Sequence, residues 1–136
     1  MVTLVKNAED YAYALMRIVT GFLFLWHGSQ KLFDIPEYPY EPAVYVIYIG
    51  GPVEFFGGLF VMLGLFTRWS AFLCSGMAAA AYWIGHGTEA FLPIVNKGEL
   101  AALYCFVFLF IFARGAGVWS VDFIRKKDEI GNTGGV

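Results

Sequence analysis

Six polar or ionisable side chains occur where the surrounding sequence is strongly apolar. An ionisable side chain at membrane depth costs a few kcal/mol, so it is retained when it is paired or functional. The predicted helices place these six groups at similar depth, so we expect them to meet in one layer near one end of the protein. They are the candidate ligand-binding residues His27, Lys31, Glu54, His86, Asn96 and Glu99.

Four kinds of chemistry fit such a layer. A histidine and a carboxylate could bind a quinone carbonyl and exchange its protons. Two histidines and two carboxylates could bind a metal ion, although no Glu-x-x-His pair occurs to suggest a di-iron centre. Two histidines could ligate a haem, but His86 is predicted near the surface. The default expectation is a Lys–Glu–His network that neutralises its own charge, followed by quinone binding, with metal or haem last.

A second group of charges lies toward the opposite ends of the predicted helices and consists of Arg17, Arg68, Arg114 and Asp122. Arg17 is near the start of the first helix and Asp122 follows the last one. Because buried ions need partners, we predict a structural Arg17–Asp122 ion pair that ties the first helix to the last. Arg68 lies in a short connection and is interpreted as a topology signal.

The elements that would position these groups are long apolar stretches. Of the 136 residues, 59% are apolar and 15% charged, and the mean hydropathy is +0.63. Soluble domains are about 45–50% apolar and about 25% charged, and one this short could not bury so much apolar surface. We therefore predict an all-α protein, a four-transmembrane-helix antiparallel bundle. Its helices would cover residues 11–33, 44–66, 69–85 and 98–113.

The connections between these stretches predict the topology. Residues 34–42 contain three prolines and three acids, which indicates a turn-rich loop, and residues 86–97 form a third loop. The positive-inside rule compares the basic residues on the two sides and places both termini in the cytoplasm of a multi-pass plasma-membrane protein. On the inner side are Lys6, Arg68 and residues 125–127, and on the outer side are Lys31 and Lys97.

The chain is predicted to have three parts. Residues 1–10 are a cytoplasmic N-terminus, residues 11–123 a single four-helix membrane domain, and residues 124–136 a polar cytoplasmic tail that frays at its end.

Small residues predict how the helices pack. The second stretch contains several glycines and the third contains Gly76 and Ala78–Ala81. No hydrophobic driving force brings helices together in lipid. Small residues instead let two helix backbones pack closely, and this contact stabilises their association. We therefore predict a tight contact between the second and third helices, through Gly57, Gly58 and Gly64 on the second.

Several functions are disfavoured by what the sequence lacks. The formal net charge is −2 and no long basic run occurs, so we expect no nucleic-acid partner. Cys74 and Cys105 form no C-x-x-C motif and are interpreted as small buried hydrophobes. No G-x-S-x-G, H-E-x-x-H or Walker motif is present.

The order and spacing of four segments resemble the DoxX family of membrane proteins. After Arg17 these segments are F-L-F-L-W-H-G-S-Q-K-L-F at 22–33, G-G-P-V-E-F-F-G-G-L-F-V-M-L-G-L-F-T-R at 50–68, N-K-G-E-L-A-A-L-Y at 96–104 and G-A-G-V-W-S-V-D at 115–122. The resemblance implies four transmembrane helices and a link to membrane redox chemistry, since related DoxD-like proteins are subunits of thiosulfate:quinone oxidoreductase. The family positions carried over are His27, Gly28, Lys31, Glu54, Asn96, Gly98, Glu99 and Asp122.

Two hypotheses of function follow. In the first, the chain is a quinone-linked or thiol/sulfur-redox-associated subunit in which His27 and Glu54 contact and protonate the quinone. Lys31 and Glu99 would tune the pKa values of these groups, and a partner redox protein would supply the electrons. In the second, the chain is a non-catalytic scaffold or assembly factor for a redox enzyme. The bilayer is a partner in both, and a homo-oligomer is compatible with either.

Overall fold

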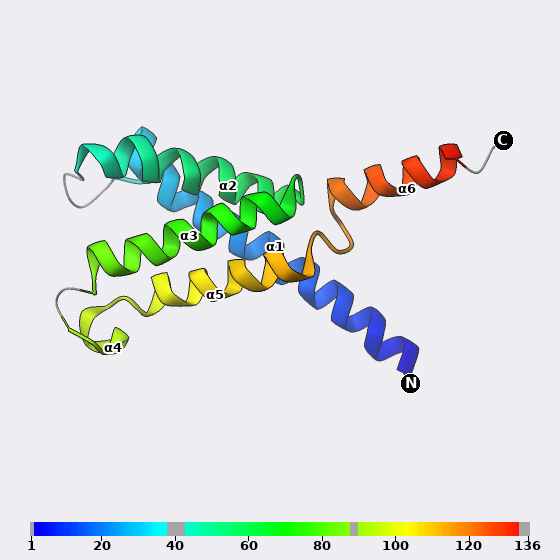
Figure 1. Cartoon of the computed structure of the whole chain (residues 1–136), viewed down its shortest axis with the longest axis horizontal. Helices are drawn as coiled ribbons and strands as arrows, with labels where there is room; N and C mark the ends of the chain where they lie inside the picture. Colours follow the sequence, from blue (N-terminus) through cyan, green and yellow to red (C-terminus); the bar gives the residue numbers. More distant parts are fainter. Residues whose placement is uncertain (1, 38–42, 88–89, 134–136) are drawn as a thin grey trace.

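The computed structural model describes residues 2–37, 43–87 and 90–133, with side chains for 7–37, 43–87 and 90–130. Within these ranges the secondary structure is helical and no strand occurs. The elements, shown in Figure 1, are α1 (Val2–Phe33), the π-helix η1 (Val46–Gly50), α2 (Gly51–Leu63), α3 (Thr67–Gly85), α4 (Pro93–Asn96), α5 (Glu99–Arg114) and α6 (Val121–Thr133).

The helices follow the four predicted apolar stretches closely, with two differences. α1 begins at Val2, so most of the predicted N-terminal segment is helical. The predicted polar tail is helical as well, because α6 continues to Thr133. Parts of the predictions lie outside the described residues, namely the loop centres at 38–42 and 88–89, the chain end at 134–136 and the side chain of Lys6.

The helices α1, α2, α3 and α5 lie alongside one another, and α6 projects away from them (Figure 1). α1 packs mainly on α2 and α3 mainly on α5, and the α2–α3 contact joins the two pairs. Both termini lie at one end of the molecule, and the C-terminal ends of α1 and α3 lie at the other (Figure 1). This arrangement separates the two predicted groups of polar residues along the length of the molecule.

Glycines bring α1 and α2 into backbone contact. A Cβ atom on Gly21 would lie 2.6 Å from the carbonyl oxygen of Gly58, and one on Gly58 would lie 2.7 Å from the backbone nitrogen of Leu25. The predicted glycine contact between the second and third helices is therefore wrong in part. Gly57 does face α3, where its Cβ would lie 2.5 Å from Cys74 Sγ, but a Cβ on Gly76 would meet nothing within 4 Å.

A compact apolar core fills the space between the helix pairs. Phe24 of α1 packs on Phe108 of α5 with ring centroids 4.7 Å apart, and Val61 and Cys74 are fully buried beside them. Both cysteines are free thiols, and only Cys74 is fully buried, whereas Cys105 is partly exposed at the edge of this core.

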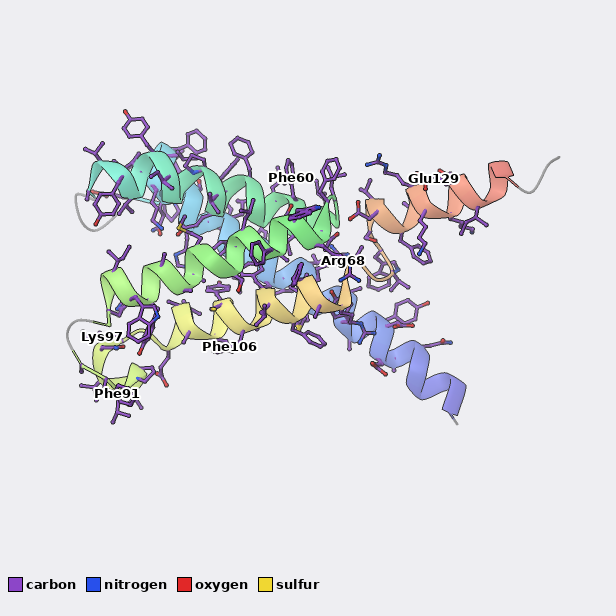
Figure 2. All side chains as sticks on the ribbon, viewed as in Figure 1. Phe60, Arg68, Phe91, Lys97, Phe106 and Glu129 are labelled. Atoms are coloured by element: carbon purple, nitrogen blue, oxygen red, sulfur yellow. The ribbon has the colours of Figure 1, made fainter. Side chains whose placement is uncertain are left out.

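The outer surface of the helices is apolar. Among the described residues, one helical stretch, Val46–Leu63, combines sufficient length with a mean hydropathy of 1.8 to be a candidate membrane span. Only 33% of that stretch is buried within the protein, whereas the core helix of a soluble protein is mostly buried. Large apolar side chains such as Leu23 on α1, Phe72 on α3 and Phe106 on α5 are also exposed, the last visible in Figure 2. An exposed apolar surface of this extent indicates contact with lipid.

Candidate functional site

A cavity of about 740 Å³ opens between the helices near the end where α1 and α3 terminate. Its walls come from α1, η1, α2, α3 and the start of α5. Small residues leave this space open, since Gly50, Ala78, Ala81 and Ala101 occupy wall positions where longer side chains would fill it. Four of the six predicted site residues line this cavity, namely His27, Lys31, Glu54 and His86.

An ion pair between Lys31 and Glu54 lies against the cavity. Glu54 is buried and Lys31 nearly so, with 5% and 11% of their side-chain surfaces exposed. Lys31 is in the last turn of α1, where the helix dipole favours a cation, whereas Glu54 lies within the continuous helical stretch formed by η1 and α2. The pair joins the two helices at the site and provides a buried cation and a buried carboxylate together.

His27 lies one turn before Lys31 on the same face of α1. Its ring is packed between aromatic side chains, with centroids 6.4 Å from Phe24 and 5.9 Å from Tyr104. No hydrogen bond to this imidazole is formed by the described residues. The ring is therefore held by packing, and its nitrogens are available to a molecule in the cavity.

His86 is held in a fixed tautomer by the loop that follows it. Its Nδ1 lies 2.9 Å from the backbone carbonyl oxygen of Asn96. Since a carbonyl only accepts hydrogen bonds, Nδ1 donates and the neutral ring has an unprotonated Nε2. His86 thus lines the cavity as a hydrogen-bond acceptor.

Asn96 positions this loop and does not line the cavity. Its side chain is 1% exposed, and its amide donates to the Ala90 carbonyl at 2.8 Å and to the Tyr82 hydroxyl at 3.3 Å. Its side-chain oxygen accepts from the backbone N–H of Gly98 at 2.8 Å. Asn96 thus holds the loop whose carbonyl orients His86.

Glu99 also does not line the cavity, although it was predicted to belong to the layer. It is exposed in the first turn of α5. Lys97, which sequence reasoning used only as a topology signal, lines the cavity instead (its position is labelled in Figure 2). The left-handed conformation of Lys97, with φ of 59°, reverses the chain before α5 begins and so places the two side chains differently.

Among the described residues, the cavity does not bring together a set of metal ligands. Within the described ranges, no group of three or more His, Cys, Asp or Glu side chains is arranged to hold a metal ion.

At the opposite end of the molecule, Arg17 binds backbone carbonyls. Its side chain is 0% exposed, and Nη1 donates to the carbonyls of Val61 at 2.6 Å and Met62 at 2.8 Å in the last turn of α2. Nη2 donates to the carbonyl of Trp119 at 2.7 Å. No ion pair joins Arg17 and Asp122 in the described part of the chain, so that prediction is corrected. Arg17 does tie α1 to the segment before α6, but through backbone carbonyls, of which that of Val61 also accepts from the Gly64 N–H.

Arg68 repeats this arrangement on the second helix pair. Its Nη1 donates to the carbonyls of Phe112 at 2.6 Å and Ala113 at 2.8 Å, at the end of α5 (Figure 2). The side chain predicted as a topology signal is therefore also a helix cap, because a cation at a helix C-terminus binds unpaired carbonyls. Arg114 joins α5 to α1 through ion pairs with Glu9 at 2.9 Å and Asp10 at 2.8 Å.

Asp122 caps the start of α3. Its carboxylate accepts hydrogen bonds from the backbone N–H of Phe66 at 3.0 Å and of Thr67 at 2.8 Å, and from the Thr67 hydroxyl at 2.8 Å. A carboxylate at a helix N-terminus satisfies backbone donors and complements the helix dipole.

Replacing Asp122 with alanine should lower the free energy of unfolding by about 1–2 kcal/mol, because two backbone donors of α3 lose their acceptor. The thermal unfolding midpoint in detergent measures this effect. Asp128→Ala on the exposed part of α6 is the control and should change the midpoint little. Equal midpoints for the two variants would contradict the capping role.

Comparison with known proteins places these features in a family. The family model for DoxX matches residues 12–87, a range that includes His27, Lys31, Glu54 and His86. An uncharacterized protein from Haemophilus influenzae is 36% identical over 130 residues, which cover 89% of this chain and 97% of that protein. No solved structure matches the chain. The chain therefore belongs to the DoxX family of membrane proteins.

Proposed function

We propose that the protein crosses the bilayer four times and binds a quinone in the cavity beside the Lys31–Glu54 pair, as a subunit of a membrane redox system. In this topology α1, η1 with α2, α3 and α5 are the spans, and both termini are cytoplasmic. The exposed apolar side chains on these helices support the proposed spans, because lipid contact would cover them. The cavity then lies in the outer half of the membrane domain.

The size and chemistry of the cavity support a quinone ligand. A volume of about 740 Å³ is within the range of roughly 300–1,000 Å³ found for small-molecule pockets. The walls are mainly apolar, and the few polar groups have complementary roles. Lys31 and Lys97 are hydrogen-bond donors suited to a quinone carbonyl, and Nε2 of neutral His86 is an acceptor suited to a quinol hydroxyl.

The single observation that carries the proposal is the buried Lys31–Glu54 ion pair on an otherwise apolar cavity. Reduction of a quinone to a quinol takes up two electrons and two protons. Glu54 and His27 are the groups placed to exchange the protons, and a partner redox protein exchanges the electrons. Lys31 would move between Glu54 and the ligand oxygen, so the pair is a polar site that a ligand could share.

Quinone affinity tests this proposal directly. Glu54→Gln and His27→Ala should each weaken the binding of a short-chain ubiquinone analogue at least about tenfold, because each removes a polar contact in an apolar site. Quenching of tryptophan fluorescence in lipid nanodiscs measures the affinity. Glu9→Gln, which alters an ion pair at the far end of the molecule, should bind as the wild type does. Unchanged affinity in both cavity variants would refute quinone binding.

A scaffold function is the second candidate, and one observation favours it. The start of α1 and the whole of α6 project beyond the packed helices, where a partner protein could contact them (Figure 1). Two results together would support the scaffold function. The wild type would show no quinone affinity, and a partner protein would co-purify equally well with the wild type and with Glu54→Gln.

A further inference from the structure

A second hollow, of about 450 Å³, lies at the end of the molecule that carries the termini. It is formed by the start of α3, the segment after α5 and the start of α6. Three cations line it, namely Arg68, Arg114 and Lys126, together with the carboxylate of Asp122. This hollow is separate from the cavity beside Lys31 and Glu54, with which it shares no lining residue.

Among the charged side chains that line this hollow, three cations accompany one carboxylate. The carboxylate of Asp122 is already engaged by three hydrogen bonds from Phe66 and Thr67. Arg114 is paired with Glu9 and Asp10 on α1, which do not line the hollow. Arg68 binds only backbone carbonyls, and in the described part of the chain neither Arg68 nor Lys126 forms an ion pair. Two positive charges therefore face the hollow without a carboxylate partner, and an anion would complement them.

Exposed aromatic side chains surround the same hollow. Phe66, Trp69 and Phe123 line it, and all three are exposed, Trp69 by 73%. Aromatic rings beside basic residues are typical of the level at which lipid headgroups meet the acyl chains. An anion bound here would therefore be accompanied by apolar groups within reach of the rings.

The start of α6 combines exposed apolar residues with basic ones. Phe123 and Ile124 are exposed by 50% and 59%, although they are large and apolar. They are followed by the basic residues Arg125, Lys126 and Lys127. α6 continues away from the packed helices (Figure 1), so it is its first turns, which line the hollow, that lie within reach of lipid phosphates.

We propose that this hollow binds the phosphate-bearing headgroup of an anionic phospholipid at the membrane surface. Arg68 and Lys126 contact the headgroup phosphate, and Trp69 and Phe123 flank the beginning of the acyl chains. The partner is a lipid, because the site combines uncompensated cations with exposed apolar rings on a membrane protein.

Native mass spectrometry of the full chain in detergent, with equal amounts of phosphatidylglycerol and phosphatidylcholine, tests the proposal. The wild type should retain phosphatidylglycerol in preference to phosphatidylcholine. Lys126→Gln should reduce this preference about fivefold, the effect expected for one basic residue near an anionic lipid. Lys126→Glu should abolish it. Lys126 is exposed, so both variants should fold as the wild type does.

Two controls separate this site from general charge effects. Lys127→Gln removes a neighbouring charge that does not line the hollow and should keep the wild-type preference. Inorganic phosphate at matched ionic strength should not displace the lipid, because it lacks acyl chains. Equal retention of both lipids by the wild type, equal losses in the Lys126 and Lys127 variants, or displacement by phosphate would each overturn the proposal.

Discussion

Replacing Arg17 with methionine should greatly reduce the yield of folded protein. The guanidinium is fully buried and donates to carbonyls at the end of α2 and in the segment before α6. Methionine fills a similar volume without donating, so the part-buried carbonyls of Met62 and Trp119 would lose their donor. Each such group costs about 1–3 kcal/mol, so the total is a large share of the roughly 5–15 kcal/mol that stabilises a typical domain.

The yield of monodisperse protein and the thermal midpoint in detergent measure this loss. Arg17→Lys keeps the charge but not the planar fork, so its midpoint should fall between those of the wild type and Arg17→Met. Arg125→Met is the matched control. Arg125 is exposed and lies 5.7 Å from the ring centroid of Phe66, so its loss should cost less than about 0.5 kcal/mol. Similar midpoints for Arg17→Met and Arg125→Met would show that the carbonyl contacts contribute little.

Gly28→Ala should destabilise the protein, whereas Gly76→Ala should leave its stability unchanged or raise it. A Cβ atom on Gly28 would lie 2.7 Å from the carbonyl oxygen of Gly51 and 2.7 Å from the Cα of Phe55. These are backbone atoms, so α1 and α2 would have to separate. Overpacking costs typically about 1–3 kcal/mol, and this contact should reach the upper part of that range.

Gly76→Ala is the matched control, because a Cβ there would meet nothing within 4 Å. Alanine is favoured over glycine inside a helix by up to about 1 kcal/mol, so this variant should be as stable as the wild type or more so. Unfolding of both variants by heat in the same detergent gives the comparison. Destabilisation by Gly76→Ala that equals the effect of Gly28→Ala would indicate a general intolerance of helix substitutions in place of a specific backbone contact.

The positions of the long helices could be predicted because apolar stretches are a property of the sequence alone. The helix contacts could not, because a glycine is small on every side and only the rotation of its helix decides what it faces. Gly58 and Gly76 illustrate this, since one touches the backbone of α1 and the other touches nothing. α6 was missed because its polar composition falls below any threshold for an apolar stretch, although it is helical.

The candidate site could be predicted in part for a similar reason. Residues at similar depth in the predicted helices are expected to lie at the same end of the bundle. Four of them, His27, Lys31, Glu54 and His86, do line one cavity. Depth does not resolve close neighbours in sequence, so the predicted layer included Glu99, which is exposed, and left out Lys97, which lines the cavity. The acceptors of Arg17 were unpredictable from side chains, because they are backbone carbonyls that every residue carries.

The carbonyl acceptors of Arg17 are synthesised at different times during translation. Its acceptors on α2 exist as soon as the first two helices have been made, whereas the carbonyl of Trp119 appears near the end of the chain. Until then one arm of a buried guanidinium lacks its acceptor. A chain that is truncated before this segment would keep the two α2 contacts of Arg17 and lack the one to Trp119. Arg17 thus makes the stability of the first helix pair depend on a segment that is synthesised near the end of the chain.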